Sequence, residues 1–573
     1  MPSPGRAVHI PLATAAVLCT LLMTTLPVLG ATSAGDQSLI RERQDKLLDD
    51  QRRRLEELQS LPGREQPEAL APTPADSRCF TVTSIALVGA DSLSEAQRGR
   101  LLKPFLGQCL GVSGLNAILK AITDHYIASG LVTSRAYLPP QDLSAGHLKV
   151  QVVEGRLEKL QPEDGSGLSP RELHMAFPGR EGELLNLREV EQLLEQLNRL
   201  PSNQAQMELV PGQAVGGSDV RVKNTPQAPW RASLARHNDG QRSTGEQQWG
   251  LALAWDNPLG LADQLSLRGG RDAVSDHQRS YQSRMLDYSL PWGWWTFGYT
   301  YSASEYRTRG QGLGFDFKYT GESQAHQLRA ERVLHRDARS KTALSTGLSH
   351  LRTASFIEDS KLGNASQRIT EAQFGLSHGR VVGSAFANLE LGMQQGIGAL
   401  DAMGDGHPRG NQPTARYRKY SATASYLLPF QLWGERLTFS SLATGQRSED
   451  VLYNSQRISV SGQAAVRGYK EQFLSGDSGG YWRNELRWAR PVTWGWLAPV
   501  LQQYGVGIAY DQGVIRHDAY SDGQNGRVSS SAAELFVAGK HASASVTFAH
   551  SLERPRALEA REAPIYFRLE LLL

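Results

Sequence analysis

The side chains that could carry out chemistry in this chain of 573 residues do not gather into a catalytic pattern. The 14 histidines are scattered without the spacing of a metal site, and no Ser/His/Asp or Cys/His grouping emerges. Cysteine is the remaining reactive residue type, and the chain contains three. We therefore predict no enzyme, no cofactor and no metal site, and we expect the covalent chemistry to be limited to thiols.

Two of the cysteines are predicted to pair, because the chain starts like an exported protein. Residues 1–30 are typical of a secretory signal peptide: Arg6 precedes an apolar run that ends in small residues, which suits cleavage after Gly30. An uncleaved membrane anchor is the alternative. In an oxidising compartment Cys79 and Cys109 are expected to form a disulfide worth about 3–4 kcal/mol. Two unpaired buried thiols are the alternative to that pairing.

The composition excludes two further classes of protein. Lys and Arg number 61 and Asp and Glu 58, so the net charge of +3 gives no support for binding nucleic acid through bulk basicity. The mean hydropathy of −0.39 and the lack of a second long apolar run exclude a helical membrane protein. A transmembrane β-barrel is still allowed, because barrel strands turn half of their side chains away from lipid.

Residues 31–61 are predicted to form one highly charged helix. The stretch from Ser38 to Leu61 has no Gly or Pro, Ser38 suits the N-cap, and Pro62 follows as a stop signal. A helix of this length is about 36 Å long, enough to cross a membrane inside a polar channel. A solvated helix or a short coiled-coil seam is the alternative. The Pro-rich residues 62–78 are predicted to be an extended linker.

Residues 79–155 and 156–224 are predicted to form two small α+β modules. Each shows the order strand, helix, helix, strand, strand, with glycines at the ends of elements. Neither module contains a metal-ligand spacing, a nucleophile motif or a phosphate loop. Modules of this kind suit peptide binding by adding a strand to a free sheet edge, and the alternative is that they are spacers.

Residues 225–573 are predicted to form a closed antiparallel barrel of about 16 strands. In residues 249–255 one face carries Trp, Leu, Leu and Trp and the other only Gly and Ala, as expected of a strand in a bilayer. In the last segment Arg568 and Glu570 share a face that must line a polar lumen. Since lipid forbids open sheet edges, such a sheet must close. A soluble β-sandwich or propeller is the alternative.

A family resemblance is carried first by the segments CFTVTSIALVG and ITDHYIASGLVTSRAYLPPQDLSAGHLKVQVVEGRLE. They closely resemble the first polypeptide-transport-associated (POTRA) domain of two-partner secretion transporters, the TpsB proteins of the haemolysin secretion/activation type. The resemblance implies that residues 79–155 and 156–224 are POTRA domains. Within the first, the candidate residues for binding the exported chain are Tyr126, Arg135, Tyr137, Leu138 and Gln141.

The barrel region resembles the same family. Its turn at Asn257-Pro258-Leu259-Gly260 with Asp263 is similar to the family's first barrel turn, and SGQAAVRGYKEQFLSGDSGGYWRNELRW is the strongest match. The resemblance implies a long extracellular loop near residues 462–476 that folds into the lumen, with its tip at Val466, Arg467, Gly468 and Tyr469. The family's F-x-D-x-G element matches at Asp511 and Gly513. Its aromatic position is Ala509 here, which puts the packing role of that side chain in doubt.

The tip residues suggest a latch that holds the loop. A buried arginine in a lumen needs a partner, and the planar guanidinium of Arg467 fits the carboxylate of Asp511 in two-point contact. Gly468 and Gly513 would let the tip approach the wall closely. By analogy with the family, the pair holds the loop during secretion. An ordinary ion pair that only stiffens the barrel is the alternative.

The resemblance implies an outer-membrane pore of a Gram-negative bacterium, with the POTRA domains in the periplasm and the helix of residues 31–61 plugging the lumen. It would export one large exoprotein of the TpsA type, a haemolysin, adhesin or contact-dependent toxin, with activation during secretion for some haemolysins. The expected surroundings are outer-membrane lipid and lipopolysaccharide, and we expect a monomer that binds no nucleic acid. The alternatives are a Bam-type outer-membrane protein insertase, an outer-membrane enzyme and a simple porin.

Overall fold

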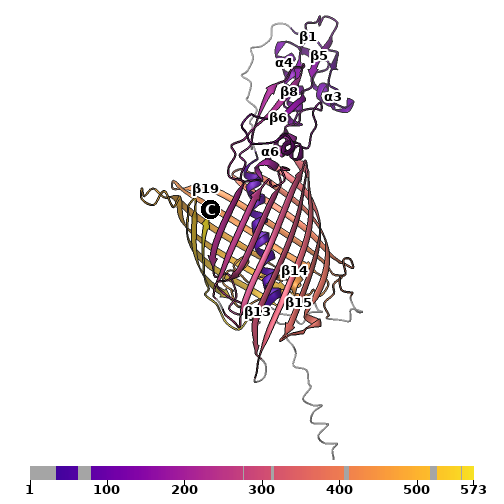
Figure 1. Ribbon diagram of the computed structural model, residues 1–573. Coiled ribbons are helices and arrows are strands. Elements are labelled where there is room, and N and C mark those ends of the chain that lie inside the picture. The colour runs from indigo at the N-terminus through magenta and orange to yellow at the C-terminus, as the bar shows by residue number, and fades with distance from the viewer. Residues whose placement is uncertain are drawn as a thin grey trace, which may run out of the picture.

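The computed structural model describes residues 34–61, 79–274, 276–311, 315–404, 412–516, 525–556 and 558–573. The predicted signal peptide (1–30) and linker (62–78) lie outside the described residues. The described chain forms a β-barrel, a helix inside it, and two small modules stacked at one mouth of the barrel (Figure 1). The helix and the second module therefore meet the barrel at the same mouth.

The barrel is closed by sixteen long antiparallel strands, as predicted. Each strand pairs with the next along the chain, and the last pairs with the first, with Arg568 opposite His237. Closure leaves no free sheet edge to face lipid. The long strands are β9 (Trp230–His237), β10 (Gln248–Asp256), β11 (Gln264–Asp272), β12 (Ser280–Trp292), β13 (Trp295–Gln311), β14 (Asp316–Arg336), β15 (Ser340–Ile357), β17 (Gln367–Val382), β18 (Ala385–Ile397), β19 (Arg418–Leu432), β20 (Glu435–Ser448), β23 (Ser478–Pro491), β24 (Gln503–Arg516), β25 (Gly526–Ala538), β26 (Ala542–Glu553) and β27 (Ile565–Leu572).

Short elements lie in the connections at the mouth of the barrel that is far from the modules. The connection from β20 to β23 is the long loop that the sequence places near residues 462–476, and it contains a small ladder of its own. The short elements are β16 (Ser360–Lys361), η2 (Gly363–Ala365), η3 (Asn454–Gln456), β21 (Ile458–Ser459) and β22 (Ser475–Gly476).

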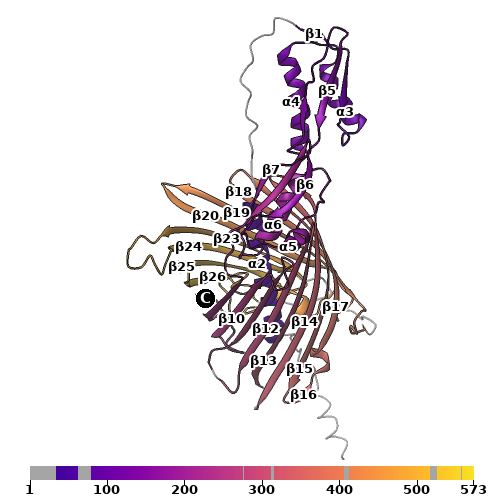
Figure 2. The ribbon, with the colours of Figure 1, turned by 45° about the horizontal axis from the view of Figure 1, so that its top comes forward.

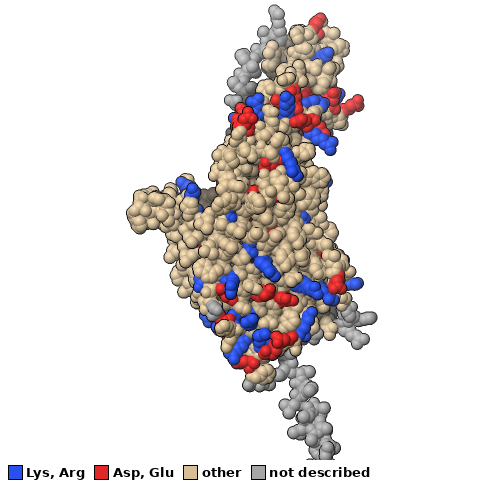
Figure 3. All heavy atoms as spheres, in the orientation of Figure 1, with Lys and Arg blue, Asp and Glu red and all other residues tan. Residues whose placement is uncertain are grey.

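The two faces of the barrel wall differ as the alternating pattern predicts. In β10 the side chains of Trp249, Leu251, Leu253 and Trp255 are exposed on the outside. Gly250, between them, lines the lumen. Charged side chains gather over the first module and at the far end of the barrel, and they leave a mostly uncharged band on the wall between (Figure 3). Such a band fits the hydrocarbon core of a bilayer.

Among the described residues, none of the helices has the length and apolar character needed to cross a membrane.

The helix α2 (Ala34–Gln59) lies inside the barrel, with its C-terminal end at the mouth next to the modules (Figures 1 and 2). It starts before the predicted N-cap, so the prediction that Ser38 caps the helix was wrong. The Ser38 hydroxyl lies within the first turn and donates to the Gly35 carbonyl at 2.8 Å. The residues near Ser38 in sequence could not indicate this start, because the contacts that stabilise the helix come from barrel strands far along the chain.

The first module holds a three-stranded sheet in the order β2–β5–β4, covered by α3 and α4. The single strand expected after Cys79 is divided into two, and the first part pairs beside the disulfide that joins Cys79 to Cys109 (Cα–Cα 5.3 Å). The bridge ties this strand pair to the start of the long helix. The elements are β1 (Phe80–Thr81), β2 (Ser84–Val88), α3 (Glu95–Leu102), η1 (Lys103–Phe105), β3 (Cys109–Leu110), α4 (Val112–Ala128), β4 (Arg135–Tyr137) and β5 (His147–Val153).

The second module repeats the plan with the sheet order β6–β8–β7. Its core packs leucines of α6 against valines of β8. Gln196 of α6 donates to the Thr296 hydroxyl of β13 at 3.0 Å, so this module contacts the barrel directly. The elements are β6 (Arg156–Pro162), α5 (Pro170–Ala176), α6 (Leu187–Asn198), β7 (Gln206–Pro211) and β8 (Gly217–Lys223).

Candidate functional site: a plugged lumen with a latched loop

The predicted latch residues meet inside the barrel wall. The Nε atom of Arg467 lies 3.1 Å from Asp511 Oδ2, and its Nη2 atom donates to Asp511 Oδ1 at 3.3 Å. A second carboxylate, Glu485 on β23, accepts from Nη1 at 3.0 Å. Because Asp511 and Arg467 are both buried, each charge depends on the other for compensation. Sequence reasoning included Glu485 in the family signature but did not assign it as a partner.

The glycines on both sides of this pair allow a close approach that no larger residue would permit. A Cβ atom on Gly468 would lie 2.5 Å from Cβ of Ser530 on β25. In the wall, a Cβ atom on Gly513 would lie 2.7 Å from Val460 and 3.2 Å from Val466. The tip therefore packs against the wall with no room for a Cβ atom at either glycine.

An aromatic side chain from the last strand packs in the same cluster as Ala509 and also contacts the loop tip. Tyr566 on β27 is buried in one cluster with Ala532 and Ala549, and Ala509 packs against this cluster. The Tyr566 hydroxyl donates to the carbonyl of Arg467 at 2.9 Å. Tyr469 at the tip is also fully buried, and its hydroxyl donates to the Glu553 carbonyl. The loop tip is thus held by backbone acceptors as well as by charge.

A carboxylate that the sequence did not reveal binds the backbone after the tip. Glu562, in the connection between β26 and β27, accepts the backbone N–H groups of Lys470, Glu471 and Gln472 at 2.8, 3.0 and 2.7 Å. Three backbone N–H groups that donate to one carboxylate bind it strongly, because hydrogen bonds to a charged acceptor are stronger than neutral ones. Lys470 also pairs with Glu246 from the β9–β10 connection. No local pattern marks Glu562, because its partners lie about ninety residues away in sequence.

Replacing Glu562 with alanine should loosen the loop after the tip without opening the barrel. Three backbone donors lose their acceptor, which costs roughly 1–3 kcal/mol for each group that stays buried. We expect faster trypsin cleavage at Lys470 in intact cells. Glu559→Ala, at an exposed acidic residue in the same connection, is the matched control. Equal cleavage in both variants would contradict this role for Glu562.

The plug helix α2 is bound to the lumen through paired charges and amides. Arg54 lies 3.0 Å from Glu331 on β14 and 3.4 Å from Glu390 on β18. One turn earlier, Gln51 donates to Glu390 at 3.0 Å and accepts from Asn388 at 3.0 Å. These contacts explain how so polar a helix is stable here: its charges find partners on the inner wall instead of water.

The two ends of α2 are fixed in different ways. At the far end, Gln44 donates to the Ser459 carbonyl at 2.8 Å, so the helix also contacts the segment that leads into the latched loop. At the mouth next to the modules, Leu55, Leu58 and Leu61 are buried against wall residues. This apolar cluster is completed by Val381, Phe386 and Leu427. These leucines therefore form an apolar seal at one end of the plug.

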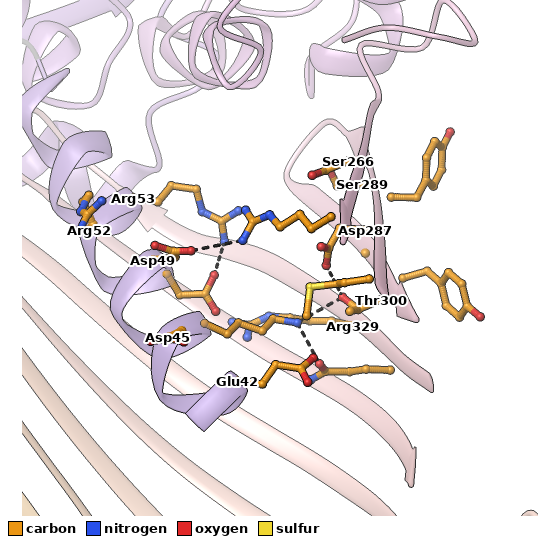
Figure 4. Close-up of a pocket in the computed structure, with 18 of the residues that line it drawn as sticks. Glu42, Asp45, Asp49, Arg52, Arg53, Ser266, Asp287, Ser289, Thr300 and Arg329 are labelled. Carbon is orange, nitrogen blue, oxygen red and sulfur yellow. Dashed lines mark hydrogen bonds and ion pairs between the residues drawn. The ribbon is translucent and has the colours of Figure 1, made fainter. Parts of the chain in front are cut away.

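A water-accessible cavity of about 740 Å³ remains beside the plug. Figure 4 shows Glu42, Asp45 and Asp49 of α2 along one side, opposite a wall that carries Asp287 and Arg329. The predicted lumen position of Arg568 is observed, because it lines this cavity and pairs with Asp239 at 2.7 Å. Within the described ranges no group of three or more His, Cys, Asp or Glu could hold a metal ion. The space is a polar channel partly filled by the helix.

One lysine joins all three parts of the molecule. Lys341 at the start of β15 lies 2.9 Å from Glu57 of the plug and also pairs with Glu195 of the second module. Glu195 pairs in turn with Arg336 at the end of β14, which lies 3.4 Å from Glu191. Plug, module and barrel therefore share one buried charge cluster, which we call the mouth cluster (Glu57, Glu191, Glu195, Arg336 and Lys341).

Replacing Glu195 with glutamine should loosen the second module from the barrel. Burial alone would raise the pKa of Glu195, but Lys341 and Arg336 outweigh it and hold that pKa below the ordinary 4.5. The docking contact is therefore present above about pH 4.5 and is lost as the pH falls toward the lowered value. Hydrogen exchange of α6 should speed up in Glu195→Gln but not in Glu183→Gln, at an exposed site of the same module. Unchanged exchange in both would contradict this coupling.

The candidate binding residues of the first module divide into two groups. Tyr137 and Leu138 are exposed at the sheet edge formed by β4, and Arg135 starts that strand with an exposed side chain. Tyr126 lies on α4, is fully buried in the core of the first module, and donates to Glu154 at 2.9 Å. The assignment of Tyr126 as a surface contact was therefore wrong: its motif position reflects packing.

Gln141 has a structural role at the edge of the same sheet. Its amide donates to the Lys149 carbonyl and accepts from the Lys149 N–H, both at 2.7 Å. The side chain thus pairs with β5 much as a neighbouring strand would. Its amide groups are already occupied by this pairing.

The family-like turn between β10 and β11 holds the second module. Asn257, at a positive φ of 58°, donates to Glu172 of α5 at 2.6 Å. The buried Asp263 accepts backbone N–H groups of Leu259 and Leu261 within the same turn. This turn therefore has a docking role that its sequence alone did not show.

A closed barrel with a lumen helix, a latched inward loop and two docked modules defines a polypeptide transporter of the outer membrane. A model of the haemolysin secretion/activation protein ShlB/FhaC/HecB matches residues 216–537, and models of a ShlB-type POTRA domain and of a POTRA domain match residues 80–155 and 156–211. The chain belongs to this haemolysin secretion/activation family. It is a two-partner secretion transporter of the outer membrane, with its POTRA domains in the periplasm.

Named relatives agree with this assignment along almost the whole chain. The outer membrane transporter CdiB of Escherichia coli O6:K15:H31 is 36% identical over 96% of this chain and 92% of its own length. The hemolysin transporter protein HpmB of Proteus mirabilis is 27% identical over 89% of this chain and 90% of its own. The solved structure of CdiB from Escherichia coli superposes with a TM-score of 0.89 at 35% identity, covering 95% of this chain and 100% of that one.

Proposed function

We propose that the chain exports one large exoprotein by removing α2 from the lumen while the loop of residues 462–476 stays latched. The observation that supports this proposal is that the plug helix and the loop tip are bound in different ways. The plug is bound mainly by separate ion pairs and amide contacts, with one apolar cluster at the mouth next to the modules. The loop tip is buried with almost no space between its glycines and their neighbours. Polar pairs can exchange for water one at a time, but a packed tip cannot.

The first step is capture of the unfolded exoprotein by the first POTRA domain. β4 is the last strand of its sheet in the described part of the chain, with Tyr137 and Leu138 exposed beside it, which suits strand addition. A strand added here would displace Thr123 from the Ala136 N–H, to which it binds at 3.4 Å. The second step is a shift of the second POTRA domain, which shares the mouth cluster with the plug. Direction comes from folding of the exported chain outside, because the periplasm offers no ATP.

The partner is a haemolysin, an adhesin or a contact-dependent toxin, with activation during secretion as a further expectation for a haemolysin. We propose that the transporter works as a monomer among outer-membrane lipid and lipopolysaccharide, binds no nucleic acid and performs no catalytic step. The Bam-type insertase alternative has less support, because the named relatives above are CdiB and a hemolysin transporter.

The test is secretion of a candidate partner, a very large secreted protein sought in the open reading frame next to the one that encodes this chain. Expressed together in a Gram-negative host, that protein should appear outside the cells only when the transporter is present. The variant Tyr137→Asp should reduce its export, whereas Val215→Asp, in an exposed turn of the second POTRA domain, should not. Export that does not depend on the transporter would contradict the proposal.

A further inference from the structure

One connection on the periplasmic side of the barrel differs from its neighbours in length and composition. Residues 492–502 join β23 to β24, whereas β19 and β20 are joined only by Trp433 and Gly434, and β12 and β13 only by residues 293–294. From residue 491 to residue 503 the chain contains no Asp, Glu, Lys or Arg. In Figure 2 this connection stands away from the barrel wall.

The connection presents its largest apolar side chains outward. Trp494 is 53%, Trp496 81% and Val500 55% exposed. The backbone is nevertheless ordered into a helical turn, because the N–H groups of Leu497 and Ala498 both donate to the Trp494 carbonyl at 2.9 and 2.8 Å. Exposed tryptophans on an ordered turn imply a surface that something apolar covers.

The turn is continuous with the lipid-facing wall. Trp494 stacks on Tyr504 of β24 with ring centroids 5.5 Å apart, and Trp488 of β23 meets the same ring edge-on at 6.0 Å. Further along the outer face of β24, Val506 and Ile508 are exposed as well. At its base, the Gln502 N–H donates to the Ala538 carbonyl at 2.8 Å, so the next hairpin supports the turn.

We propose that residues 492–502 dock into the periplasmic leaflet of the outer membrane, with phospholipid as their occupant. Tryptophan favours the interface between hydrocarbon and headgroups, because its ring is apolar while its N–H can still reach water. The absence of charge across the segment fits lipid, and its apolar surface extends a wall that already faces lipid. Trp433, 92% exposed in the neighbouring β19–β20 turn, widens the same docking surface.

Docking here would anchor the two strands that carry the latch. β23 bears Glu485 and β24 bears Asp511, and residues 492–502 join these strands at the opposite mouth from the loop tip. The bilayer would therefore hold the periplasmic ends of these strands in place while α2 leaves the lumen and the exported chain enters it.

A fluorescent label at residue 496 tests the proposal. Cys79 and Cys109 are tied in the disulfide and Cys19 belongs to the predicted signal peptide, so Trp496→Cys provides a single thiol for an environment-sensitive dye in the protein from residue 31 onward. The protein is placed in vesicles of phosphatidylethanolamine and phosphatidylglycerol. The matched control is Val215→Cys, which is 93% exposed in the second POTRA domain. Val500→Cys is a second position in case Trp496→Cys folds poorly.

At residues 496 and 500 we expect blue-shifted emission, strong quenching by a nitroxide on the lipid headgroup region, and several-fold weaker quenching by iodide than at residue 215. Iodide quenching equal to that at residue 215 would show the turn in water and overturn the proposal. Protection from both quenchers would show cover by protein and would overturn it too.

Discussion

Replacing Arg467 with alanine is expected to abolish most export of the exoprotein while the barrel stays closed. The change leaves buried Asp511 without the guanidinium that compensates it, which costs about 3–5 kcal/mol. That energy shifts the balance between the latched and the released loop by roughly a hundred- to several thousandfold. The measurement is the amount of exoprotein outside the cells, with barrel folding checked by heat-dependent gel mobility.

Arg487→Ala is the control for this prediction. Arg487 also lies on β23 and also pairs with Glu485, at 2.7 Å, but its other partner is Glu534 on β25 and not the loop. The Arg487→Ala variant should export most of the exoprotein that the parent protein exports. If Arg467→Ala exported normally from a folded barrel, the pair would only stiffen the wall and the latch would be wrong.

Replacing Arg54 with alanine is expected to open the lumen. Arg54 connects the plug to Glu331 and Glu390, and its loss costs about 3 kcal/mol, the lower end for a buried pair, since Arg329 and Gln51 still reach those carboxylates. The plugged state should become roughly a hundredfold less favoured. In planar lipid bilayers the variant should therefore show large open events far more often than the parent protein.

The neighbouring residue offers a close control. Arg53 is largely exposed, and within the described residues its ion pair is local, with Asp50 of the same helix at 3.0 Å. Arg53→Ala should leave the conductance near that of the parent protein. The variant that lacks residues 34–59 gives the upper limit of the conductance. Equal conductance with and without these residues would contradict the role of α2 as a plug.

The elements of the POTRA domains were predictable because their signals are local. The order strand, helix, helix, strand, strand that was predicted for residues 156–224 is observed as β6, α5, α6, β7 and β8. Alternation and glycine stops mark such bounds within a few residues of chain. The same reasoning failed for Tyr126, because a motif position does not distinguish a packing residue from a contact residue.

The contacts that make the lumen work were beyond prediction. Arg54 meets Glu331 and Glu390, which lie on strands far along the chain, and these meetings depend on barrel closure and register. The same holds for Glu562, whose three backbone partners belong to a different loop. Tyr566 is a further example: it lies three strands after Ala509 along the chain, and Ala509 packs against the cluster that contains it.

A disulfide between the plug and the wall tests whether α2 must leave the lumen during export. Gly379 on β17 would place a Cβ atom 3.2 Å from Cγ of Leu58, so the pair Leu58→Cys and Gly379→Cys is placed to form a disulfide. We predict that the oxidised variant exports no exoprotein and that mild reduction restores export, while the same treatment leaves the parent protein and each single variant exporting. Normal export from a fully cross-linked variant would show that α2 does not need to leave the lumen, and would contradict the account.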